Sequence, residues 1–179
     1  MYGVKERIIH YMLHMTTELL EQLRNKDEEA FKKLYQAYVK LVYHIAFSYT
    51  YNKEDAEDIV SEVFMKVLDS LDTYQEKGKF KEWISMITRN IALNFVTRDK
   101  HKEVLRDEEI IKKTKNYNEN YNEMIIMFEE VLDKDTVSIM ILRFIYGYKF
   151  KEIASILEMT IGKVQSMYYD GLEKLRKVY

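Results

Sequence analysis

The chain has 179 residues, enough for one domain or two small ones, which excludes a large barrel enzyme. Apolar residues make up 47% and charged residues 32%, so the chain can bury a core, and the net charge of -2 argues against an indiscriminate nucleic-acid coat. No proline and only 5 glycines leave too few turns for a many-stranded sandwich or barrel, whereas the abundant Glu, Lys, Leu, Ile and Met favour helices. The composition predicts an all-α fold.

The absence of cysteine excludes a disulfide framework, a thiolate zinc site and a cysteine nucleophile. It also suits a reducing cytosol, so we expect a cytoplasmic protein. The first fifteen residues have no long apolar run and no small-residue cleavage site, and they are therefore not expected to be a signal peptide. Charges interrupt every stretch before about 18 apolar residues accumulate, so no membrane insertion is expected.

The charge alternates along the chain. Residues 18–76 carry 7 basic and 13 acidic side chains, whereas residues 77–106 carry 8 basic and 3 acidic ones. The pattern repeats, with 4 basic and 9 acidic in residues 107–135 and 7 basic and 4 acidic in residues 136–179. Two basic blocks suit phosphate, and two acidic blocks would repel it and could meet a basic protein partner. Ordinary solvated helix faces are the alternative.

Three long helices are predicted in the first half of the chain. Asp27, followed by two glutamates, begins an apolar pattern with helical spacing over 28–50. Asn52 caps the next amphipathic run, and Gly78 separates that run from a third helix over about 80–98. Long helices with short loops predict a compact bundle.

The second half begins with a charged, Asn-rich stretch over 99–120, interpreted as a linker, with a polar-faced helix as the alternative. Four helical segments follow. The last two are a short helix ending at Leu157 and a helix in which Val164 can pack back, joined by a turn at 158–160. This is a helix-turn-helix layout, whose second helix offers its first polar residues to the DNA major groove.

The order of four segments gives a more specific signal. They are AFKKLYQAYVKLVYHIAFSYT, KEDAEDIVSEVFMKVLDSLDTY, GKFKEWISMITRNIAL and FKEIASILEMTIGKVQSMYYDGLEKLRK. Together they resemble bacterial RNA polymerase sigma factors of the short, two-domain extracytoplasmic-function (ECF) group, over residues 18–98 and 122–177. The resemblance implies an N-terminal helical bundle (sigma region 2) at 18–98, the linker at 99–120 and a C-terminal four-helix domain with the helix-turn-helix (sigma region 4) at 121–179. Residues 1–17 are expected to be a leader, with Met15 as the candidate true start.

The resemblance implies a specificity subunit that directs RNA polymerase core to promoters. In the family the second long helix binds the polymerase clamp, and its acidic character here agrees, because carboxylates that avoid DNA can pair with basic groups on a protein. The alternative is a solvated acidic face that binds no partner. The polymerase-binding candidates are Asp55, Asp58, Ser61, Glu62 and Met65.

The third helix and the loop before it are expected to bind the minus-ten element of promoter DNA and open its strands. Lysines there can neutralise phosphates. Extruding a base from the stack costs about a few kcal/mol, which stacking and hydrogen bonds in a protein pocket must offset. Tyr74 is the candidate stacking aromatic, whereas Trp83 lies on the apolar stripe and is expected in the core. The minus-ten candidates are Tyr74, Lys77, Lys79, Lys81 and Asn90.

The last helix is expected to read the minus-thirty-five element, with Gln and Lys contacting base edges or phosphates. Three of its positions that are usually basic in the family hold Gln165, Met167 and Asp170, and this predicts an unusual upstream element or weak dependence on it. Asp133 replaces the family's usual Leu-Pro helix start as a cap. The minus-thirty-five candidates are Arg143, Lys149, Thr160, Lys163, Gln165, Ser166 and Tyr169.

Two other functional classes are alternatives to a sigma factor. A helix-turn-helix regulator that does not engage polymerase shares the last two helices but needs no acidic clamp surface. An enzyme is disfavoured, because the one metal-like spacing, His10 with His14, lacks an HExxH pattern, and no phosphate-cradling Gly loop is present. No cofactor and no metal are expected, and the catalysis is assigned to the partner polymerase. The family also suggests a possible anti-sigma partner.

Overall fold

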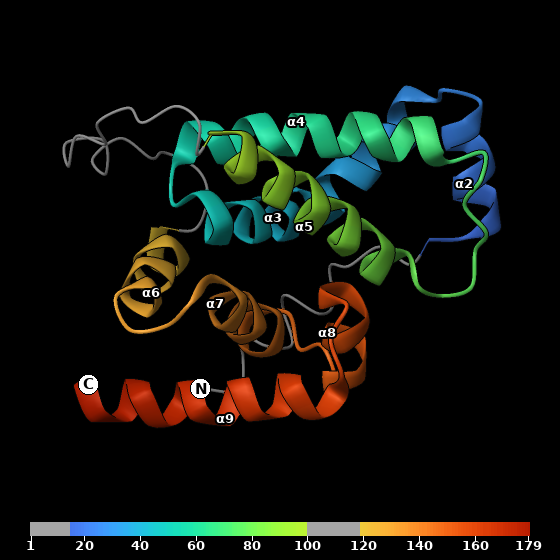
Figure 1. Ribbon diagram of the computed structural model, residues 1–179. Helices are drawn as coiled ribbons and strands as arrows, with labels where there is room; N and C mark the ends of the chain where they lie inside the picture. Colours follow the sequence, from blue (N-terminus) through green and yellow to red (C-terminus); the bar gives the residue numbers. More distant parts are fainter. Residues whose placement is uncertain (1–14, 100–118) are drawn as a thin grey trace.

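The computed structural model describes residues 15–99 and 119–179, and Figure 1 shows these ranges as coloured ribbons. Residues 1–14 of the expected leader and residues 100–118 of the expected linker lie outside the described residues. The described residues form helices and no strand, which confirms the all-α prediction. The elements are α2 (Thr17–Arg24), α3 (Glu28–Thr50), α4 (Lys53–Ser70), α5 (Phe80–Asp99), α6 (Glu119–Glu129), α7 (Lys134–Met140), the π-helical segment η2 (Ile141–Ile145), α8 (Phe150–Leu157) and α9 (Ile161–Val178).

Helix starts follow the capping signals in the sequence. Asp27 accepts a hydrogen bond from the Ala30 amide at 2.7 Å, and Asn52 accepts one from the Asp55 amide at 3.1 Å. Asp133, in place of a proline start, accepts the Thr136 amide at 3.0 Å. Each side chain satisfies an amide that has no partner within the first turn of its helix, so these positions fix where the helices begin.

The N-terminal bundle consists of α2, α3, α4 and α5. Helix α3 packs against both α4 and α5, and α4 also packs against α5, so the three long helices enclose a shared core. Leu34, Ile59 and Val63 are fully buried there, and Ile84 comes from α5. This is the compact bundle that the helical spacing predicts.

The C-terminal unit consists of α6, α7, η2, α8 and α9. Helix α7 continues directly into the π-helical segment. Helix α8 ends at Leu157 and is followed by its C-cap Glu158, whose φ of 54° places it in the left-handed conformation. Helix α9 begins three residues later and packs against α7 and α8. The turn at residues 158–160 is the one predicted for the helix-turn-helix.

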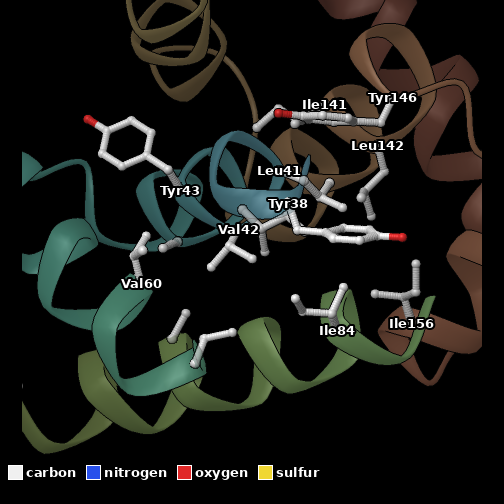
Figure 2. Packing of buried hydrophobic residues seen from close by; sticks show 14 of the residues in the cluster. Tyr38, Leu41, Val42, Tyr43, Val60, Ile84, Ile141, Leu142, Tyr146 and Ile156 are labelled. Atoms are coloured by element: carbon white, nitrogen blue, oxygen red, sulfur yellow. The ribbon is translucent and has the colours of Figure 1, made fainter. Parts of the chain in front are cut away.

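The two units pack against each other, with α3 against α6 and α7, and α5 against α8 (Figure 1). In consequence every residue from 41 to 50 of α3 is buried, so this half of the helix has no solvent face. Figure 2 shows Tyr38 and Ile84 of the bundle around the same core as Leu142 and Ile156 of the C-terminal unit. The sequence did not indicate this arrangement, because Tyr43, His44 and Ser48 read as the polar side of an amphipathic helix.

Among the described residues, no helix is both long enough and apolar enough to cross a membrane.

Candidate functional site

One surface of α4 combines acidic and apolar side chains. Asp58, Ser61, Glu62 and Met65 are exposed, and Asp55 lies half-buried one turn earlier. Met65 is 62% exposed, and Leu68 on the same helix is 38% exposed, whereas the other face of α4 is buried in the core. We call these five residues the α4 acidic face. An apolar side chain among carboxylates fits a protein partner with basic groups around an apolar spot.

The loop between α4 and α5 presents two lysines. Lys77 and Lys79 are exposed on either side of Gly78, whose φ of 69° is in the left-handed region that glycine adopts without strain. Glu76 accepts a hydrogen bond from the Gly78 amide at 2.5 Å, which closes the turn. The turn therefore leaves both lysine side chains exposed to solvent.

Tyr74, the candidate stacking aromatic, is only 8% exposed. Its ring centroid lies 4.5 Å from that of Trp83 and 5.3 Å from that of Phe80, and its hydroxyl donates to Glu76 at 3.1 Å. Burial, with the nearby Glu76 carboxylate, raises the pKa of the Tyr74 phenol. A base could stack on this ring only after the aromatic cluster rearranges, and Trp83, expected in the core, is half-buried beside it.

Arg24 of α2 holds this loop in place, a role that no sequence pattern indicated. Its guanidinium donates to the carbonyl of Leu71 at 3.1 and 2.8 Å and to the carbonyl of Tyr74 at 3.0 Å. These carbonyls follow α4, where backbone acceptors lack partners within the helix. No local motif marks such an arginine, because its partners lie 47 and 50 positions away.

Lys81 lies between the two units. Its ammonium donates to the carbonyl of Tyr146 at 2.9 Å and lies 3.8 Å from the ring centroid of Tyr148. Burial lowers the pKa of Lys81 to about 8, although Glu152 and Glu82 act in the opposite direction. The ammonium of Lys81, which was expected to contact a phosphate, is thus bound to the C-terminal unit in this arrangement. Asn90, the other α5 candidate, is exposed.

The N-terminal end of α9 is exposed to solvent. Thr160 caps the helix by accepting from the Lys163 amide at 3.2 Å, as predicted. Lys163, Gln165 and Ser166 are exposed, and Tyr169 is 59% exposed. These side chains share the surface that a major-groove helix would present.

The remaining two minus-thirty-five candidates differ in availability. Arg143 is half-buried: its guanidinium donates to the Tyr148 carbonyl at 2.8 Å and lies 4.8 Å from the Phe150 ring centroid. Lys149 is exposed at the start of α8, with its amide donating to Glu152 at 2.6 Å. Lys149 is thus accessible from solvent, whereas Arg143 holds the loop before α8.

The structure describes no group of three or more carboxylate or imidazole side chains arranged to hold a metal ion in the part of the chain that it covers. His10 and His14 lie outside the described residues.

Comparison with known families identifies both units. The family described as "Sigma-70 region 2" matches residues 34–102, and "Sigma-70, region 4" matches residues 130–175. The RNA polymerase sigma factor SigV of Bacillus subtilis is 33% identical over 137 residues, covering 75% of this chain and 81% of SigV. The chain belongs to the ECF group of bacterial RNA polymerase sigma factors.

A second relative is the ECF RNA polymerase sigma factor SigX of Bacillus subtilis, 29% identical over 171 residues and covering 84% of each chain. Among solved structures, the sigma factor RpoE from Bartonella quintana, in complex with the anti-sigma factor NepR, has a TM-score of 0.68 at 20% identity. That likeness covers 82% of this chain and 94% of RpoE, and it shows the fold.

The sigma factor is therefore a promoter-recognising subunit that works with RNA polymerase core and promoter DNA. Its N-terminal bundle is region 2 and its C-terminal unit is region 4. Lys77 and Lys79 lie in the same loop as Tyr74, whereas the α4 acidic face lies on the helix before that loop. It also reveals a set of side chains between region 2 and region 4 that no motif indicated: His44, Ser48, Ser85, Ser138, Tyr146 and Tyr148.

Proposed function

We propose that the α4 acidic face is the surface with which this sigma factor binds the clamp of RNA polymerase. Four of its five side chains are exposed, and Met65 offers an apolar contact at its C-terminal end. Carboxylates at such a surface steer a basic partner and add specificity, and the apolar group adds burial on binding. The exposed Met65 among carboxylates is the observation that carries this assignment.

The α4–α5 loop and helix α5 as far as Asn90 are the proposed minus-ten site. Lys77 and Lys79 are exposed and can neutralise backbone phosphates, and Asn90 can contact a base edge. Tyr74 is the proposed stacking aromatic, and its burial requires that a base displace part of the Trp83 contact. This displacement adds to the cost of strand opening, which makes the site selective for a base that fits.

The minus-thirty-five contacts are proposed for the exposed N-terminal end of α9. Lys163 can meet a phosphate or guanine, and Gln165 can pair with adenine. The acidic Asp170 accepts a hydrogen bond from Ser166 at 3.1 Å, so this surface carries less positive charge than a typical phosphate-binding helix. Upstream-element substitutions are expected to reduce transcription less than minus-ten substitutions, and equally steep losses at both elements would contradict this.

The remaining assignments concern the cellular setting. Because RpoE of Bartonella quintana was solved with an anti-sigma factor, we infer that an anti-sigma protein also restrains this chain. We infer that it acts in the cytoplasm together with RNA polymerase, and we assign the chemistry of RNA synthesis to the polymerase, with no cofactor or metal proposed for the sigma factor. A helix-turn-helix regulator without polymerase is not favoured by the two matched sigma regions.

Runoff transcription with bacterial core polymerase and genomic fragments tests the two region 2 sites. Asp58→Lys should weaken core binding at least tenfold, with Glu123→Lys on α6 as the matched exposed control. Lys79→Glu should leave core binding intact and reduce open-complex formation at least tenfold, with Lys33→Glu on α3 as its control. If neither variant differed from its control, both site assignments would be wrong even though the family is established.

A further inference from the structure

Two exposed side chains on α9 form a surface that only accepts hydrogen bonds. The Ser166 hydroxyl donates its one hydrogen to Asp170 Oδ2 at 3.1 Å, one helical turn further along. Because that hydrogen is already used, Ser166 offers only lone pairs to another partner, and the Asp170 carboxylate has no hydrogen to donate. We call these two residues the α9 acceptor edge.

The α9 acceptor edge faces solvent in a fixed orientation. Ser166 and Asp170 are exposed, whereas Val164 is fully buried on the other side of the helix. The ring of Tyr168 packs against Phe150 of α8 at a centroid distance of 5.2 Å, and this contact holds the rotation of α9 about its own axis. A site on a helix that is held in this way keeps its geometry when a ligand arrives.

Gly162 keeps the surface beside this edge free of a side chain. It lies one turn before Ser166 on the same side of α9, and a Cβ there would meet nothing within 4 Å. The packing of the chain therefore does not require glycine at this position, although glycine is a poorer helix former than alanine. The missing side chain leaves room for a base edge to come close to Ser166.

Positive charges lie on both sides of Asp170 along the helix. Lys163, seven positions earlier, and Lys174, four positions later, are exposed on the same side of α9. Each lysine can neutralise a backbone phosphate, so the two together outnumber the single carboxylate. A carboxylate can therefore approach a base in the groove between two phosphate contacts.

The major groove of DNA offers few partners to an acceptor. Its hydrogen-bond donors are the amino groups of adenine and cytosine, whereas guanine and thymine present carbonyl oxygens there. A basic side chain, which the family resemblance implies at position 170, donates hydrogen bonds and so prefers guanine. An aspartate at this position reverses that preference.

We propose that Asp170 is a specificity-determining residue of this sigma factor. It fixes the Ser166 hydroxyl as an acceptor, and the two side chains together select adenine or cytosine at one position of the minus-thirty-five element. This inference rests on the proposed contact of α9 with that element. Asp170 adds base preference rather than affinity, because its negative charge repels phosphates whatever the sequence.

Selection from a promoter pool tests the proposal. RNA polymerase holoenzyme made with the full chain binds promoter fragments whose upstream element is randomised, and the bound fragments are sequenced. With the natural chain, one position on one strand should favour adenine or cytosine over guanine and thymine by about fivefold or more. Asp170→Asn, which keeps the shape but adds an amide donor, should reduce this ratio below about twofold at that position alone.

Two further variants separate base preference from charge. Asp170→Ala removes the acceptor of the Ser166 hydroxyl, which can then donate to a base, and it should also reduce the ratio below about twofold. Glu123→Gln on α6 removes an exposed negative charge outside α9 and should leave the ratio unchanged. A charge effect alone would change the binding of every fragment by the same factor and preserve the ratios.

Two results would overturn the acceptor edge. One is a selected sequence that both Asp170 variants leave unchanged. The other is a preference for guanine or thymine that these variants abolish, since an acceptor edge cannot pair with a carbonyl oxygen. Failure of the α9 assignment itself looks different: the natural chain would then enrich no base in the randomised element, although binding would still require the minus-ten element.

Discussion

The hydroxyl of Tyr146 lies 2.6 Å from Nδ1 of His44, 102 positions earlier in the chain. Both groups are buried, and the other ring nitrogen of His44, Nε2, has no hydrogen-bond partner among the described residues. Burial, with a smaller contribution from Lys40, lowers the pKa of His44 to about 4. The imidazole is therefore neutral at neutral pH while region 4 is packed on region 2, and protonating it weakens this packing.

Acidification should weaken the packing of region 4 on region 2 through His44. Its pKa is depressed below the usual 6.5, so its contribution is complete above pH 6.5 and is lost as the pH falls towards 4. The Tyr146 phenol has a pKa raised well above 10 by burial and does not titrate in this range. Between pH 7.5 and 5.5 the natural chain should lose about 1 kcal/mol more stability than His44→Gln, measured by urea unfolding. Equal losses in both chains would contradict this.

Gly171 sets how closely α9 approaches α7. A Cβ there would lie 2.7 Å from Met140 Cε and 2.8 Å from Thr136 Cγ2. The methionine end can move, but the β-branched threonine is stiff, so Gly171→Ala should destabilise region 4 by about 1–3 kcal/mol. Gly162→Ala is the matched control, because its Cβ would meet nothing within 4 Å in the same helix. Gly171→Ala should therefore lower the thermal unfolding temperature, whereas Gly162→Ala should raise it.

Arg24 should matter for strand opening through the loop that it holds. Arg24→Met keeps the aliphatic length and removes the hydrogen bonds to the carbonyls of Leu71 and Tyr74. We expect core binding within twofold of the natural chain and open-complex formation reduced about tenfold, measured by permanganate reactivity of the promoter. Lys33→Met on α3 is the exposed control. An equal loss of both properties would indicate a general folding defect.

The cap of α9 gives a test confined to the recognition helix. Thr160→Ala removes the acceptor of the Lys163 amide and should cost region 4 about 1 kcal/mol, whereas Thr160→Ser keeps the cap. The alanine variant should weaken upstream-element binding more than minus-ten binding, measured with fragments that carry one element each. Identical behaviour of the alanine and serine variants would exclude a capping role.

The sequence by itself determined the three long helices, the helix-turn-helix, the two sigma regions and the caps, because helix periodicity and capping depend on residues three or four positions apart. It did not indicate α2 or the π-helical segment. Asn52, Asp133 and Thr160 each cap the helix at which they were expected. The order of the motifs also identified the family. The residue-level contacts with polymerase and DNA stay predictions.

Only the tertiary structure decided how region 4 lies against region 2. Ser48 and Ser138 are 90 positions apart, and each looks like an ordinary polar residue in its own helix. Lys81 reads as a phosphate ligand from local charge, yet its ammonium meets the Tyr146 carbonyl 65 positions away. Such pairings depend on long-range packing, which neither helical spacing nor local charge can predict. The same packing buries every residue in the C-terminal half of α3, which therefore has no solvent-exposed face.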